Sequence, residues 1–273
     1  MENETEYFLS QDGLRLYYRL WAAENPKQLL CIVHGFGEHS GRYQHVAHYF
    51  NNLGITVFAM DLRGHGISQG KKGHARNLDI MLSDIEELLK TARAENTDLP
   101  MFLMGHSMGG NLVANYMIKM NTNELKGFML SSPWFKLAFE PPKWKVSLAN
   151  TISKIIPSLA QKADLVTAHL SRDPEVVKAY ENDPLVHGTM TARLFVECLN
   201  GGEQALQRAS EIKKPGLVIH GSEDKVINPT ASKAFADKND QIKFVSMEGS
   251  YHESLNDLDK EQVMKIMADW MLA

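Results

Sequence analysis

Short, almost wholly apolar segments recur along this chain, and they constrain its fold more than any other feature. They occupy residues 29–33, 55–60, 101–104, 128–130, 216–219 and 242–245. A strand that is covered on both faces is apolar at nearly every position, whereas a strand with one solvated face alternates. Helical periodicities lie between most of these segments, such as the one over residues 78–94. We therefore predict an α/β fold with a mostly parallel, twisted central sheet flanked by helices.

The first part of the chain carries a different pattern. Apolar and polar side chains alternate over residues 14–19, directly after a turn signal at residues 11–13. Alternation with a period of two is typical of an antiparallel strand with one buried face. We expect residues 6–21 to form two antiparallel strands joined by this turn.

The regular alternation of strands and helices is interrupted in the second half of the chain. It stops at Trp134 and resumes near Lys214. The intervening segment carries large apolar residues at helical spacing and several prolines that mark loops or helix ends. We expect residues 134–213 to form a helical cap, or lid, inserted over the strand ends, and residues 1–133 and 214–273 to form the core.

Composition and charge exclude several classes of protein. The chain of 273 residues is 44% hydrophobic and 23% charged, which is typical of a globular protein. Its net charge of −4 provides no general attraction for nucleic acid, so no nucleic-acid partner is expected. The acidic N-terminus lacks the apolar core of a signal peptide, and no apolar stretch approaches the roughly 18 residues of a membrane span. With only Cys31 and Cys198 as cysteines, we expect a reducing, cytoplasmic location.

One short motif carries chemistry. Gly105-His106-Ser107-Met108-Gly109 matches the pattern G-x-S-x-G and lies between a predicted strand and a predicted helix. In such a strand–turn–helix the serine is held at strained dihedral angles at the sheet edge, and small neighbours let backbone pass close by. The helix N-terminus beneath it favours negative charge. We predict Ser107 as a nucleophile; the alternative is a glycine-rich turn with a surface serine.

A serine hydroxyl needs a base, and the base needs an orienting carboxylate. Where the serine occupies this kind of turn, the acid and then the histidine follow it in the chain. Asp224 follows the predicted strand at residues 216–219, with Glu223 as the alternative acid, and His252 follows the last predicted strand. Parallel strands end at the same edge of a sheet. We therefore predict that Ser107, Asp224 and His252 meet there as a catalytic triad.

Such a triad also requires amide donors for the negatively charged oxygen that forms on the substrate. We expect one from Met108, next to the nucleophile, and the other from Phe36 in the loop His34-Gly35-Phe36-Gly37. The glycines of that loop do not complete a dinucleotide-binding pattern, and the sequence contains neither H-E-x-x-H nor C-x-x-C. Accordingly, no cofactor and no metal are expected.

Together these motifs resemble those of monoacylglycerol lipases, which are S33-type serine hydrolases with the α/β-hydrolase fold. The similar segments are H-G-F-G-E-H-S-G-R-Y at residues 34–43, D-L-R-G-H-G-I-S-Q-G at 61–70, G-H-S-M-G-G at 105–110, H-G-S-E-D-K-V at 220–226 and Y-H-E at 251–253. The resemblance runs from about residue 10 to the C-terminus. It implies the same triad and the same two amide donors, with no cofactor.

The resemblance also implies a function. We expect a serine hydrolase that cleaves carboxylic esters of lipid-like substrates, above all monoacylglycerols, to an alcohol and a fatty acid. A lysophospholipase or a broad-specificity carboxylesterase would carry the same triad, and a non-catalytic lipid-binding protein of this fold is a further alternative. No feature of the sequence points to an oligomeric state.

An apolar stripe of the cap, over residues 144–159, bears on the substrate. We expect Ile152 and Ile156 on this stripe to line the acyl site and the cap to make transient contact with a membrane surface. The alternative is a helix that buries the stripe permanently against the core.

Overall fold

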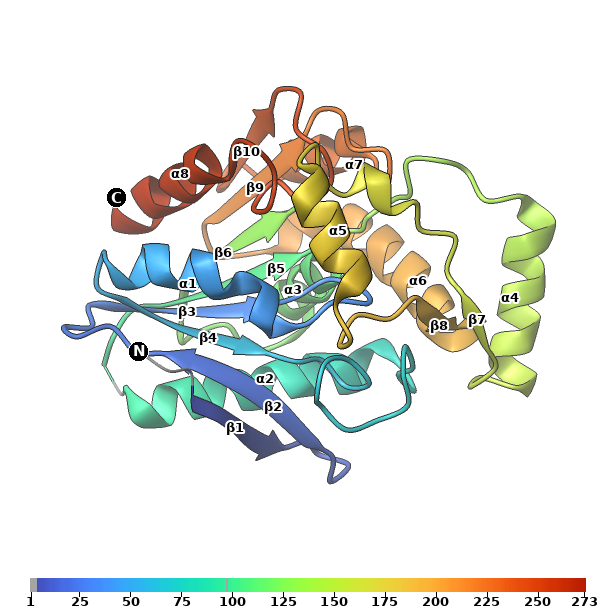
Figure 1. Cartoon of the computed structure of the whole chain (residues 1–273), viewed down its shortest axis with the longest axis horizontal. Coiled ribbons are helices and arrows are strands. Elements are labelled where there is room, and N and C mark those ends of the chain that lie inside the picture. The colour runs from blue at the N-terminus through green and yellow to red at the C-terminus, as the bar shows by residue number, and fades with distance from the viewer. Residues whose placement is uncertain (1–3, 97) are drawn as a thin grey trace.

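The computed structural model describes residues 4–96 and 98–273. Its centre is an eight-stranded sheet in the order β1-β2-β4-β3-β5-β6-β9-β10 (Figure 1). The strands are β1 (Glu4–Leu9), β2 (Arg15–Trp21), β3 (Gln28–Val33), β4 (Ile55–Met60), β5 (Met101–His106), β6 (Leu125–Ser131), β9 (Gly216–Gly221) and β10 (Ile242–Met247). β2 runs antiparallel to both of its neighbours, and the other pairs are parallel. The predicted mostly parallel sheet and the N-terminal antiparallel pair are confirmed.

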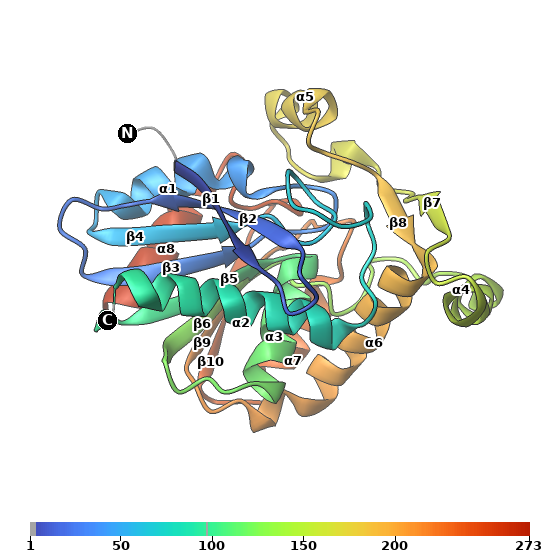
Figure 2. The same cartoon turned by 90° about the horizontal axis from the view of Figure 1, so that it is seen from below.

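Helices cover both faces of this sheet (Figure 2). α1 (Gln44–Asn51) and α8 (Lys260–Leu272) lie on one face, and α2 (Leu78–Glu95), α3 (Met108–Lys119), α6 (Ala192–Arg208) and α7 (Pro229–Ala236) lie on the other. On β3, Leu30 and Ile32 pack toward α1, while Leu29, Cys31 and Val33 pack toward α2 and α3. Because both faces are covered, the central strands are apolar at consecutive positions. β10 lies at the sheet edge and is only half buried.

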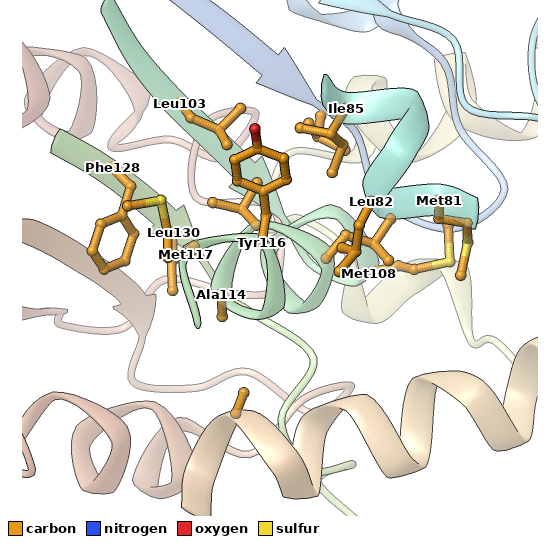
Figure 3. Close-up of a cluster of buried hydrophobic side chains, with 14 of the residues drawn as sticks. Met81, Leu82, Ile85, Leu103, Met108, Ala114, Tyr116, Met117, Phe128 and Leu130 are labelled. Atoms are coloured by element: carbon orange, nitrogen blue, oxygen red, sulfur yellow. The ribbon is translucent and has the colours of Figure 1, made fainter. Parts of the chain in front are cut away.

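The larger of the two apolar layers lies between α2, α3 and the sheet (Figure 3). Leu82 and Ile85 of α2 and Met108 and Tyr116 of α3 are buried in it, together with Leu103 of β5. Each fully buried aliphatic side chain stabilises the fold by about 1.5–3 kcal/mol. This packing holds the N-terminus of α3 against the end of β5, which is where the serine motif lies.

A segment between β6 and β9 crosses the carboxyl ends of the strands (Figure 1). Its elements are α4 (Lys143–Ile155), β7 (Ala160–Lys162), the short 3-10 helix Thr167–His169, α5 (Pro174–Asn182), β8 (Thr189–Thr191), α6 and the 3-10 helix Ala209–Glu211. α4 ends two residues before Pro157, as predicted. α6 shares the buried cluster of α2 and α3, so its apolar face belongs to the core packing. The boundaries of a cap at residues 134 and 213 stay a prediction.

None of the helices in the described part of the chain is long and apolar enough to cross a membrane.

Candidate active site

The serine motif forms a sharp turn between β5 and α3. β5 ends at His106, α3 begins at Met108, and Ser107 between them has φ 50° and ψ −114°, a region that non-glycine residues rarely adopt. Gly105 and Gly109, which flank the turn, are required because there is no room for a side chain at either position. A Cβ on Gly105 would lie 2.3 Å from the carbonyl oxygen of Gly109, and a Cβ on Gly109 would lie 2.1 Å from that of Val33. The turn therefore exists because both neighbours lack side chains.

Three strand ends bring the predicted triad together. The Ser107 hydroxyl lies 3.1 Å from Nε2 of His252, and Nδ1 of His252 lies 2.7 Å from Oδ2 of Asp224. Because Nδ1–H donates to the carboxylate, Nε2 carries the lone pair that accepts the serine proton. Glu223, the alternative acid, is exposed, whereas Asp224 is buried. Of the two candidate acids, the structure brings Asp224 to the histidine.

Four donors hold the Asp224 carboxylate. Its Oδ1 accepts the amides of Val226 and Ile227 at 2.7 and 3.0 Å, and its Oδ2 accepts both His252 and Nε2 of His220, the latter at 2.9 Å. Burial raises the pKa of this carboxyl, but His252 and His220 outweigh burial and lower the pKa well below its usual range. Asp224 is therefore ionised at neutral pH. His220 was not among the predicted site residues.

The residues around His252 shift its pKa. Burial lowers the pKa of His252, but the Asp224 carboxylate outweighs burial and raises the pKa above its usual value. The ring of His106 lies with its centroid 5.0 Å from that of His252. Burial, and then the nearby His252, lower the pKa of His106 to about 4, so His106 stays neutral when His252 takes up a proton. The arrangement favours an imidazolium on His252 alone.

The predicted amide donors lie beside the serine. Met108 is the first residue of α3, where a backbone N–H has no acceptor within the helix. A Cβ on Gly35 would lie 3.2 Å from Cβ of Ser107, so the loop that contains Phe36 passes directly against Ser107. The Gly35 amide donates to Oε1 of Glu38 at 2.7 Å, which holds this loop in place.

A buried ion-pair network joins the Phe36 loop to the histidine loop. Arg42 donates to Glu38 at 2.8 Å and to both carboxylate oxygens of Glu253 at 2.7 and 2.6 Å. Tyr43 donates to Glu38 at 2.9 Å. Burial raises the pKa of Glu38, but Arg42, His106 and His34 together outweigh burial and lower this pKa to about 2. Glu38, Arg42 and Glu253 lie within the motifs at residues 34–43 and 251–253, but the sequence alone indicates no role for them.

A cavity of about 550 Å³ opens above the triad. Its floor includes Ser107, His252, Glu38 and Glu253. Most of its wall is apolar and comes from the segment between β6 and β9; this part includes Leu137, Phe139, Trp144, Leu148, Ile152, Leu159, Leu165, Leu170, Met190 and Phe195. The volume is within the range of small-molecule sites, about 300–1,000 Å³.

The two residues that were expected to line the acyl site, Ile152 and Ile156, differ in their position relative to the cavity. Ile152 lies in the last turn of α4 and lines this cavity. Ile156 does not line it and is 53% exposed. The helix ends at Ile155, and Ile156 has φ −133° and ψ 69°, so its side chain leaves the helical spacing on which the prediction relied. Ile156 therefore lies outside the lining of this cavity, and its predicted contact with the acyl chain stays a prediction.

Within residues 4–96 and 98–273, no three His, Cys, Asp or Glu side chains are arranged to hold a metal ion.

Comparison with known proteins gives consistent similarities. A family model described as serine aminopeptidase, S33, matches residues 24–259. A monoacylglycerol lipase of Mycolicibacterium smegmatis is 33% identical over 270 residues, which cover 97% of this chain and 96% of that protein. The phospholipase YtpA of Bacillus subtilis is 30% identical, with 90% of this chain and 95% of that protein covered. The crystal structure of the monoacylglycerol lipase of Paleococcus ferrophilus superposes with a TM-score of 0.86 at 30% identity and covers 93% of this chain and 97% of its own.

Proposed function

Since this chain belongs to the serine aminopeptidase S33 family, we propose that it hydrolyses monoacylglycerols to glycerol and a fatty acid through an acyl-enzyme on Ser107. It is an ester hydrolase with the α/β-hydrolase fold. One observation carries the proposal: the hydrogen bonds from Ser107 through His252 to Asp224 lie at the floor of a largely apolar cavity.

In the proposed mechanism, His252 Nε2 takes the Ser107 proton as Oγ attacks the ester carbonyl carbon. The amides of Phe36 and Met108 stabilise the oxygen that becomes negative. The imidazolium on His252 gives its proton to the leaving alcohol, and the acyl group stays on Oγ. Water then attacks the acyl-enzyme with His252 again as the base, which releases the fatty acid and restores the serine.

The Asp224 carboxylate supports both steps. It holds Nδ1–H of His252 at 2.7 Å, which keeps the lone pair on Nε2 before attack. Once the imidazolium has formed, the negative charge of Asp224 stabilises it, in agreement with the raised pKa of His252. Asp224 itself stays ionised, because its own pKa is lowered by the two histidines.

The polar end of the cavity favours an uncharged alcohol. Two carboxylates, Glu38 and Glu253, line the cavity beside the triad, and both pair with the single guanidinium of Arg42. A phosphate group there would face an excess of negative charge, whereas glycerol hydroxyls can donate to carboxylate oxygens. This supports monoacylglycerol over lysophospholipid. Lysophospholipid is the second candidate, because the chain is similar to a bacterial phospholipase.

The cap supports a further part of the proposal, namely contact with a lipid surface. Trp144, Leu148 and Ile155 on α4 are each at least half exposed, at 64%, 50% and 72%. Trp144 and Leu148 also line the cavity, so a lipid that leaves a membrane at this face would meet the wall of the site. Cys31 and Cys198 are buried free thiols, which suits action from the cytoplasm.

A substrate panel tests the proposed function. The purified protein is assayed on long-chain monoacylglycerols, lysophospholipids and short p-nitrophenyl esters, with Ser107→Ala as the inactive control. We expect the highest kcat/KM on monoacylglycerol and loss of activity on all three in the variant. A preference for lysophospholipid would mean that lysophospholipid, and not monoacylglycerol, is the substrate. Full activity of Ser107→Ala would refute the mechanism.

A further inference from the structure

Another buried carboxylate, Asp257, lies in the loop between β10 and α8, which carries His252. Its side chain is fully buried, and it accepts hydrogen bonds from the amides of Tyr251 and Leu258 at 2.8 and 2.9 Å. It also accepts the amide of Arg172 at 2.9 Å and Nε of the same arginine at 3.0 Å. Asp257 thus binds backbone amides of two segments that are far apart in the sequence.

The backbone amides on both sides of His252 are anchored. The amide of Tyr251, the residue before it, donates to Asp257. The amide of Glu253, the residue after it, donates to the carbonyl oxygen of Leu170 at 2.8 Å. Leu170 directly precedes the segment that Asp257 binds through Arg172. The Asp257 carboxylate therefore supports both hydrogen bonds: it accepts the Tyr251 amide directly, and it holds the segment of Leu170 through Arg172. These two bonds hold the backbone on either side of His252 in place.

We propose that Asp257 is a positioning residue for His252, and that through Arg172 it uses the segment between β6 and β9 to hold the histidine against Ser107 and Asp224. The proposal rests on the proposed function of His252 as the base. The geometry of the base matters because the chain of bonds from Ser107 to Asp224 passes through a single imidazole ring. Asp257 does not line the cavity and acts only through the loop.

The chain offers a matched control in Asp259. Its carboxylate also binds Arg172, at 2.5 Å, and accepts the Ser250 hydroxyl at 2.9 Å. However, its side chain is 35% exposed, and within residues 4–96 and 98–273 it accepts no backbone amide of the loop. Asp259→Asn therefore removes the same charge beside the same arginine and leaves the amide anchors in place.

The experiment compares Asp257→Asn with Asp259→Asn on monoacylglycerol, with Ser107→Ala alongside. Small misplacements of a catalytic group lower rates by up to about a hundredfold, so we expect kcat of Asp257→Asn to fall about tenfold to a hundredfold. KM should change less than about twofold, because no cavity residue is altered. Asp259→Asn should stay within about twofold of the wild type in both constants.

The pH profile separates positioning from simple loss of stability. The charged and titratable groups that face His252 are Asp224 after β9, Glu38 after β3, His106 at the end of β5 and Glu253 in its own loop. A looser bond to Asp224 should move the acidic limb of kcat/KM to lower pH in Asp257→Asn. Partial unfolding, in contrast, lowers the fraction of active protein but does not change the pH at which kcat/KM falls.

Each outcome decides the proposal. Equal kcat and equal pH limbs for folded Asp257→Asn and Asp259→Asn would overturn it. If Asp257→Asn does not fold, Arg172→Gln takes its place, since that change keeps the Asp257 carboxylate; kcat should fall more than about threefold, and no fall would overturn the proposal. Activity of Ser107→Ala would instead refute the proposed function itself.

Discussion

Replacing Ile152 by serine tests whether α4 forms the wall of the acyl site. Ile152 lines the cavity from the last turn of α4 and is half-buried, so the change should leave the fold intact. If two to three methylene groups of the acyl chain lose apolar contact, the loss is about 1.6–2.4 kcal/mol at ~0.8 kcal/mol each. With tenfold per ~1.4 kcal/mol, kcat/KM for a long-chain monoacylglycerol should fall about 15- to 50-fold.

The assay compares that substrate with a short p-nitrophenyl ester, whose acyl group does not reach the wall and whose kcat/KM should change less than about twofold. Ile156→Ser is the matched control, because Ile156 is 53% exposed and does not line the cavity. The reasoning is refuted if both substrates lose activity equally in Ile152→Ser. It is also refuted if Ile156→Ser reproduces the selective loss.

Three further predictions concern the triad and its turn. Because Asp224 raises the pKa of His252 above the usual 6.5 and only neutral imidazole can act as base, kcat/KM should fall on acidification with an apparent pKa above 6.5; a flat profile down to pH 5 in folded protein would contradict this. His220→Ala removes one charge-assisted bond to Asp224, so kcat should fall about tenfold (~1.5 kcal/mol) with little change in KM, and steady-state kinetics that show no fall would argue against a role. Gly109→Ala places a Cβ 2.1 Å from the Val33 carbonyl oxygen and should lower the free energy of unfolding by more than about 2 kcal/mol, measured by urea titration; an unchanged midpoint would contradict the packing argument.

The core of the fold could be predicted from the sequence because each strand and turn there is determined by its own residues. Strands such as β3 and β4 are covered on both faces, so nearly all of their residues are apolar. The serine turn was predictable because it needs Gly105 and Gly109 for space alone. Ser107, Asp224 and His252 could be brought together because parallel strands end at one sheet edge.

What the sequence did not predict depends on contacts between distant segments, on how loops fold and on where a helix ends. Arg42 and Glu253 are 211 residues apart, and no local pattern indicates that they pair. The role of His220 depends on how the loop after β9 folds back over its own strand end. The placement of Ile156 depends on where α4 stops, and helix ends shift by a residue or two without changing the apolar pattern. β10 is half exposed because it lies at the sheet edge.

Covalent labelling tests the central claim most directly, because only an activated serine reacts rapidly with a fluorophosphonate. The protein is treated with the probe, and the modified peptide is identified by mass spectrometry, with Ser107→Ala and His252→Ala treated in parallel. The account predicts one adduct per chain, located on Ser107, no adduct in Ser107→Ala and labelling slowed at least about a thousandfold in His252→Ala. An adduct on another residue, or labelling of folded His252→Ala at the wild-type rate, would contradict it.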